Sequence, residues 1–139
     1  MQRLVIDTNV YVDWLNVGHH EAVLFQRDAV KYLSAIVVME LYAGAFTPRD
    51  RRIIGGVVSA FRRTGRVLVP PGTVYEEAGH VLRSLQRDSG YDLARAHSLA
   101  NDVLIALSAR AIGATVVTRN QRDFTAIQAV RQFSLALLR

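Results

Sequence analysis

The chain has 139 residues, of which half are hydrophobic and 21% are charged, and its 17 Lys and Arg outnumber 12 Asp and Glu to give a formal net charge of +5. This length and balance predict a single domain over residues 1–139. The absence of cysteine excludes disulfides, thiolate zinc sites, iron–sulfur clusters and cysteine nucleophiles. No apolar run reaches the roughly 18 residues that span a bilayer, and the N-terminus lacks signal-peptide features, so we expect a cytoplasmic protein with no membrane partner. The basic excess is arginine apart from Lys31, which is compatible with a polyanionic partner but also with a biased genomic base composition.

Short apolar runs alternate along the chain with stretches of helical periodicity. We expect strands at residues 3–6, 31–34, 66–69, 114–118 and 132–135. We expect helices at 9–15, 21–28, 37–46, 49–63, 73–88, 101–112 and 122–127, and a further helical stretch capped by Asp92. Thr73 and Glu76 have the spacing of a capping box, and Gly113 suits the end of a helix. Short, wholly apolar strands separated by helices predict an α/β fold with a parallel sheet covered on both faces.

Acidic residues follow the predicted strands or open the predicted helices, where ligands of parallel sheets bind. Asp7 follows the first strand, although it also suits a helix N-cap. Glu40 lies in an apolar stretch, where a buried carboxylate needs a partner such as a metal and an exposed one would compensate a helix dipole. Asp102 precedes the apolar first turns of the helix with the strongest periodicity, with a cap as the alternative. Either Asn120 or Asp123 could point into the same cleft from a later strand end.

Carboxylates gathered at one sheet edge repel one another unless a cation neutralises them. Hard divalent ions such as Mg²⁺ or Mn²⁺ prefer all-oxygen sites of this kind. The chemistry that such ions favour is phosphoryl transfer, in which water attacks phosphorus and the metal charge stabilises the oxygens. The acidic residues therefore indicate hydrolysis of a nucleic-acid backbone.

Four segments in chain order carry a family resemblance: VIDTNV at 5–10, MEL at 39–41, NDVLIA at 101–106 and VTRNQRDF at 117–124. They resemble the PIN-domain ribonucleases, and among these the VapC-type toxins of bacterial and archaeal toxin–antitoxin pairs. The resemblance covers essentially the whole chain. It implies a Rossmann-like three-layer α/β/α sandwich with a short parallel sheet, and a metal-dependent endoribonuclease site.

The resemblance also implies roles for individual residues. Asp7 and Asp102 would be the principal Mg²⁺ ligands, with Mn²⁺ as an alternative ion, and Glu40 would complete the acidic site directly or through a coordinated water. The residues expected to orient these carboxylates or water are Thr8, Asn9, Thr118 and Asn120.

One position departs from the family pattern. The family often has an acid two residues after the threonine that corresponds to Thr118, and this sequence has Asn120 there. Asp123 could substitute, or the fourth position could hold a neutral oxygen ligand. The departure leaves open whether one metal ion binds or two.

The resemblance implies three partners: an RNA substrate (tRNA, rRNA or mRNA), a small antitoxin protein that covers the groove with apolar residues, and a second copy in a homodimer. We expect Arg119 and Arg122, which flank the predicted cleft, to contact RNA. A second group of arginines is explained equally well as a solvated helix face, namely Arg49, Arg51, Arg52, Arg62, Arg63 and Arg66.

The remaining aromatic and histidine residues favour simpler interpretations. The large apolar residues Trp14, Leu15, Tyr42, Phe46 and Phe61 are expected in the core, although a few could line an antitoxin groove. The histidines lack zinc-site spacing; His19–His20 is expected as a solvated turn, and His80 and His97 on helix faces.

Two rival functions remain to be distinguished. Phospho-aspartyl receivers also place an aspartate after the first strand, but they use a lysine at a later strand end, and the only lysine here is Lys31. A degenerate PIN domain that binds RNA or a partner without cutting is left open by Asn120, although Asp7, Glu40 and Asp102 argue against it.

Overall fold

The apolar runs form one five-stranded sheet in which every pairing is parallel, in a computed structural model that describes residues 1–139. The strands are β1 (Gln2–Ile6), β2 (Ala29–Ser34), β3 (Val67–Leu68), β4 (Thr115–Thr118) and β5 (Ser134–Leu137). Their order across the sheet is β3-β2-β1-β4-β5. The end of β1 and all of β4 are buried because these central strands are covered on both faces.

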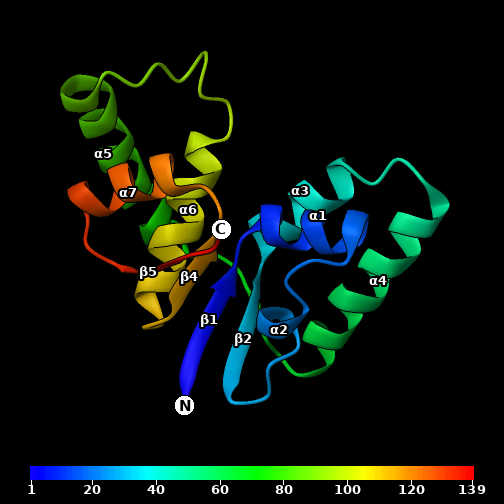
Figure 1. Ribbon diagram of the computed structural model, residues 1–139. Helices are drawn as coiled ribbons and strands as arrows, with labels where there is room; N and C mark the ends of the chain where they lie inside the picture. Colours follow the sequence, from blue (N-terminus) through cyan, green and yellow to red (C-terminus); the bar gives the residue numbers. More distant parts are fainter.

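Seven helices connect the strands and form two outer layers (Figure 1). They are α1 (Thr8–Val17), α2 (Glu21–Leu24), α3 (Ala35–Ala43), α4 (Pro48–Arg63), α5 (Gly72–Ser89), α6 (Leu99–Ala111) and α7 (Gln121–Val130). The chain winds outward from β1 to β3 and then returns to β4, so right-handed crossovers place α1–α4 on one face and α5–α7 on the other. The predicted three-layer α/β/α fold is confirmed.

The direction of winding reverses between β1 and β4, which are neighbours in the sheet. Ile6 pairs with Val117, and the amide of Asp7 donates to the Val117 carbonyl at 2.9 Å. Asp7 therefore lies beside Thr118 at the carboxyl edge of the sheet. Ligand sites of open α/β sheets form at this kind of reversal.

Helix α6 lies deep in the structure, with nine buried residues in its thirteen. It packs between β1 and β4 on one side and α5 and α7 on the other, which explains why its sequence is apolar on nearly every face. Asp102 belongs to its first turn and is buried with it. The apolar helix thus carries a carboxylate to the carboxyl edge of the sheet.

Two of the expected helix starts are wrong. Helix α5 begins at Gly72 with extended Pro71 before it, because the two prolines end the strand segment and Thr73 already lies inside the helix, where its side chain caps nothing. The stretch after Asp92 forms only a turn, in which the Asp92 side chain accepts from the Ala94 amide. Helix α6 ends as expected, with Gly113 in the left-handed region at φ 67°.

The expected core placement is also partly wrong. Trp14, Leu15 and Phe61 pack against the core, but Tyr42 is 43% exposed and Phe46 is 85% exposed. Helix α3 ends at Ala43, so Phe46 does not continue its buried face, and Tyr42 points away from the core side. No helix combines the length and the apolar character needed to cross a membrane.

The histidines also differ from expectation at two positions. His80 lies on the exposed face of α5 as predicted, whereas His97 lies in the turn before α6. His20 is not in a solvated turn: its side chain is 13% exposed and contacts Asp13.

Candidate active site

Asp7 lies at the reversal point of the sheet and is 4% exposed. Its Oδ1 accepts from the Thr8 amide at 2.8 Å, so it is also the N-cap of α1. Its Oδ2 accepts from the Thr118 hydroxyl at 2.7 Å and from the Asn9 side-chain amide at 3.2 Å. These bonds fix the carboxylate. Asp7 caps helix α1 and is also a candidate site residue, so the two interpretations are compatible.

Glu40 reaches the same edge from α3 and is half-buried. Its Oε1 accepts from the Thr8 hydroxyl at 2.7 Å, and its Oε2 accepts from the Asn101 side-chain amide at 3.4 Å. Thr8 therefore links Glu40 to the segment that carries Asp7. Asn101 was not expected in this role, although it directly precedes Asp102 in a segment that carries the family resemblance.

Asp102 and Asp123 approach from the other layer of helices and are joined by Asn120. The Asn120 side-chain amide donates to Asp102 Oδ2 at 3.2 Å and to Asp123 Oδ2 at 3.0 Å. Asp102 Oδ1 receives no hydrogen bond from the protein, whereas Asp123 Oδ1 accepts from the Tyr91 hydroxyl at 2.8 Å. Asn120, at the position of the family's acid, therefore acts as a donor between two carboxylates.

We call Asp7, Glu40, Asp102 and Asp123 the acidic cluster. None of them forms an ion pair with a Lys, Arg or His side chain. Burial is the main reason that the pKa of Asp102 is raised to about 8, and the negative charges of the other three acids raise it further. Only the hydrogen bond from Asn120 lowers this pKa. Burial also raises the pKa of Asp7, against the bonds from Thr118 and Thr8. The cluster is thus an excess of negative charge that a cation would neutralise.

The candidate metal ligands suit a divalent ion, because all of them are carboxylate or neutral oxygen atoms. No three acidic or histidine side chains converge as a ready-made metal site. A hard ion held by one or two of these carboxylates would therefore depend on waters to complete its shell, as Mg²⁺ commonly does in proteins.

A cavity of about 320 Å³, here called the carboxylate cavity, opens over the cluster. Its wall includes Asp7, Glu40, Asp102, Ser98, Arg119 and Asn120. The structure therefore brings three of the four predicted acids, which lie far apart in the sequence, to one hollow. Asp123 borders the neighbouring cavity instead and reaches Asp102 through Asn120.

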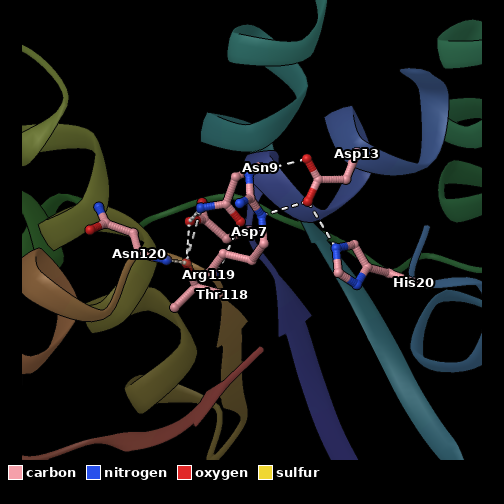
Figure 2. A network of polar contacts seen from close by, with 7 residues as sticks. All are labelled: Asp7, Asn9, Asp13, His20, Thr118, Arg119 and Asn120. Atoms are coloured by element: carbon pink, nitrogen blue, oxygen red, sulfur yellow. Dashed lines mark hydrogen bonds and ion pairs between the residues drawn. The ribbon is translucent and has the colours of Figure 1, made fainter. Parts of the chain in front are cut away.

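Arg119 is held at the rim of this cavity by a polar network that the sequence analysis did not foresee (Figure 2). Its guanidinium binds both oxygens of Asp13, and Asp13 also contacts His20 Nε2 at 2.8 Å. The Arg119 amide donates to Asn9 Oδ1 at 3.2 Å. Asn9 and Asp13 lie four residues apart on one face of α1, a spacing that does not reveal Arg119 as their common partner.

The second predicted RNA contact, Arg122, lies on α7 above the ring of Tyr91, at 5.9 Å from its centroid. Tyr91 was missed because nothing in its local sequence marks it. The other group of arginines is exposed, in agreement with a solvated surface: Arg49, Arg51, Arg52, Arg62, Arg63 and Arg66.

Comparison with known proteins matches this geometry to one family. The family described as PIN domain matches residues 4–130. No curated protein gives a significant sequence match.

Solved structures share the whole fold. DNA-bound VapBC from Salmonella typhimurium is similar with a TM-score of 0.71 at 25% identity, over 98% of both chains. VapBC2 from Rickettsia felis, bound to a promoter DNA fragment, gives 0.69 at 22% identity over 99% of this chain and 100% of that one. VapBC-5 from Mycobacterium tuberculosis gives 0.70 at 19% identity over 99% and 100%. The resemblance to VapC-type PIN domains is confirmed, and the chain belongs to the PIN domain family.

Proposed function

We propose that the protein is a metal-dependent endoribonuclease that hydrolyses RNA phosphodiester bonds. The observation that carries the proposal is the acidic cluster at the sheet reversal: two of its members are almost fully buried, and none has a basic partner. Buried carboxylates without a counter-charge are costly, so their retention at a cavity favours a bound cation. Nuclease activity is the chemistry of the PIN family, to which the chain belongs.

In this proposal Asp7 and Asp102 hold Mg²⁺ or Mn²⁺, with Glu40 as a further ligand, directly or through water. The ion would supply positive charge that polarises the phosphodiester and offsets charge on the leaving oxygen. Thr118 and Asn9 fix the Asp7 carboxylate, and Thr8 fixes Glu40. Asn120 orients Asp102 through Oδ2, and Oδ1 of this cavity-lining residue accepts no hydrogen bond from the protein.

The rival phospho-aspartyl interpretation loses further support from the position of Lys31. This residue pairs with Leu4 in the sheet, three residues before Asp7, and its ammonium donates to the carbonyls of Leu24 and Gln26. The only lysine is therefore engaged away from the carboxyl edge.

We further propose that the chain is the toxin of a toxin–antitoxin pair, acting in the cytoplasm and forming a homodimer. The similar structures named above are VapBC complexes. Large apolar side chains are exposed on and after α3, namely Met39, Tyr42 and Phe46. Val12 of α1 lines both the carboxylate cavity and a groove against α3 and α4, so an antitoxin segment seated in that groove would also reach the acids.

The test uses purified protein freed of any antitoxin and incubated with total RNA. We expect cleavage with Mg²⁺ or Mn²⁺, none with EDTA, and none in Asp7→Asn or Asp102→Asn. Asp28→Asn is the matched control, because Asp28 is exposed just before β2, at the opposite edge of the sheet. Cleavage that persists in either site variant would point to a contaminant and remove the support. RNA binding by the wild type without cleavage would favour a degenerate PIN domain.

A further inference from the structure

A second cavity, about 640 Å³ in volume, lies next to the carboxylate cavity. We call it the Tyr91 cavity. It lies among the end of α5, the turn that follows and the start of α7, and its wall includes Tyr91, Arg95, His97, Ser98, Arg122 and Asp123. Its volume is in the range of small-ligand sites, about 300–1,000 Å³.

The two cavities adjoin in the structure, because Ser98 lines both of them. Asp123, in the wall of the Tyr91 cavity, is joined through Asn120 to Asp102 in the wall of the other. A nucleic-acid strand whose scissile phosphate lies at the acidic cluster would therefore place a neighbouring nucleotide in the Tyr91 cavity.

The Tyr91 ring packs against the core, and its hydroxyl joins it to the cavity wall. The hydroxyl donates to Asp123 Oδ1 at 2.8 Å, and the other Asp123 oxygen accepts from Asn120. Both Asp123 oxygens are thus already hydrogen-bonded, which favours a supporting role for this acid in the cavity wall. The ring itself is only half-buried and borders the cavity.

Arg122 gives the cavity a cation that is free to bind a ligand. Its guanidinium lies 5.9 Å from the centre of the Tyr91 ring, and no carboxylate lies within ion-pairing distance. Arg95, also at the cavity, makes only a long contact of 3.8 Å with Asp92 and is almost fully exposed.

We infer that the Tyr91 cavity binds a nucleotide of single-stranded RNA adjacent to the scissile bond, with its phosphate on Arg122 and its base against Tyr91. The inference rests on the proposed ribonuclease function. An aromatic ring next to an unpaired guanidinium is the combination that binds unpaired nucleotides, because the ring stacks on a base and the cation holds the backbone. A wall that is mostly polar and charged suits such a ligand better than an apolar peptide segment.

The test measures RNA binding separately from cleavage. A labelled, unstructured oligoribonucleotide of mixed sequence is titrated with the Asp102→Asn variant in Mg²⁺, and affinity is read by fluorescence anisotropy at several salt concentrations. In this background Tyr91→Ala is expected to weaken binding between about 5-fold and 150-fold. Tyr91→Phe, which keeps the ring, is expected to bind nearly as the parent. Arg122→Ala is expected to reduce the slope of log affinity against log salt by about 0.7.

Arg27→Ala is the matched control, since Arg27 is an exposed arginine before β2, at the opposite edge of the sheet. Circular dichroism and thermal unfolding establish that each variant folds, and Tyr91→Phe retains the buried contacts of the ring. If Tyr91→Ala and Arg122→Ala bind RNA as Arg27→Ala does, the inference is overturned while the ribonuclease proposal stands, and a polypeptide becomes the better occupant. A parent that binds no RNA overturns the inference, and cleavage of total RNA by the wild type then decides separately whether the ribonuclease proposal stands.

Discussion

Asp13 binds Arg119 through both carboxylate oxygens, although the two residues are 106 positions apart in the chain (Figure 2). Asp13 lies on α1, Arg119 follows β4, and His20 contacts the same carboxylate from the turn before α2. The pair joins the segments that follow β1 and β4, the two strands between which the sheet reverses. It therefore sets the position of a guanidinium at the rim of the carboxylate cavity.

Asp13→Ala is expected to raise the KM for RNA severalfold and to leave kcat almost unchanged, because it frees Arg119 without touching the acidic cluster. The ion pair is partly exposed, so its loss should change the free energy of unfolding by at most about 1 kcal/mol. Steady-state cleavage of a labelled RNA gives both constants, and Asp28→Asn serves as the control. A KM equal to that of the control would show that Arg119 does not depend on Asp13.

Replacing Arg119 and Arg122 together by alanine is expected to weaken RNA binding and lower its salt dependence. Each lost phosphate contact should reduce the slope of log affinity against log salt by about 0.7 for a single strand. Binding titrations over a range of NaCl concentrations measure the slope. An unchanged slope would remove both arginines from the RNA surface.

The metal-free protein is expected to lose stability as the pH rises toward 8. Asp102 has a folded-state pKa of about 8 against an ordinary value of 3.8, so between these values the folded state holds a proton that the unfolded state has released. This favourable contribution is fully present below the unfolded pKa and is lost as the pH rises through the folded pKa. Denaturant unfolding in EDTA at pH 6 and pH 8 measures the loss.

Asp102→Asn provides the comparison for this pH effect, because it removes the titrating group and keeps the shape. We expect the variant to lose less stability than the wild type between pH 6 and pH 8, with a difference of at most about 1.4 kcal/mol for each pH unit, because this interval lies between the unfolded and folded pKa values of Asp102. Parallel pH profiles for the two proteins would contradict the assignment.

The meeting of Asp7 with Thr118 could be anticipated from the sequence, because both follow short apolar runs that a parallel sheet aligns at one edge. Glu40 and Asp102 also stood out as acids beside apolar segments, and the family segments gave them their roles, because a helix alone does not indicate which way a carboxylate points. Helix starts were predicted less well where competing signals overlapped: the two prolines before Gly72 outweighed the capping residues Thr73 and Glu76.

The remaining part of the site depends on contacts that no local pattern encodes. Tyr91 reaches Asp123 across 32 residues and Asp13 reaches Arg119 across 106. Each contact arises from how a loop or helix packs after the sheet has formed. Single sequences carry little information on such pairs, since each side chain alone is compatible with a solvated surface.

Mg²⁺ or Mn²⁺ is expected to raise the thermal unfolding temperature, and to do so more at pH 8 than at pH 6. An ion that binds only the folded state stabilises it by mass action, by about 2.7 kcal/mol at one hundred times its Kd. The ionised carboxylate of Asp102 binds a metal ion better than the protonated form does, and the fraction that is ionised grows as the pH approaches 8. NaCl at matched ionic strength is the control, and an equal effect of the ion on Asp102→Asn would place the binding elsewhere.

Thr118 offers the sharpest test of how the protein positions Asp7. Its hydroxyl is fully buried, donates to Asp7 Oδ2 at 2.7 Å and accepts from the Asn120 amide at 3.0 Å. Thr118→Val keeps the shape but removes one of the two hydrogen bonds to Asp7 Oδ2 and leaves the Asn120 backbone amide without this acceptor, so it is expected to cost about 1–3 kcal/mol of unfolding free energy and to lower kcat. Thr118→Ser keeps the hydroxyl and should retain most of the activity, although it loses a methyl group from the core. If the valine variant cleaves RNA as fast as the serine variant, the hydroxyl does not orient Asp7 for catalysis, and the carboxylate is held well enough by Thr8 and Asn9 alone.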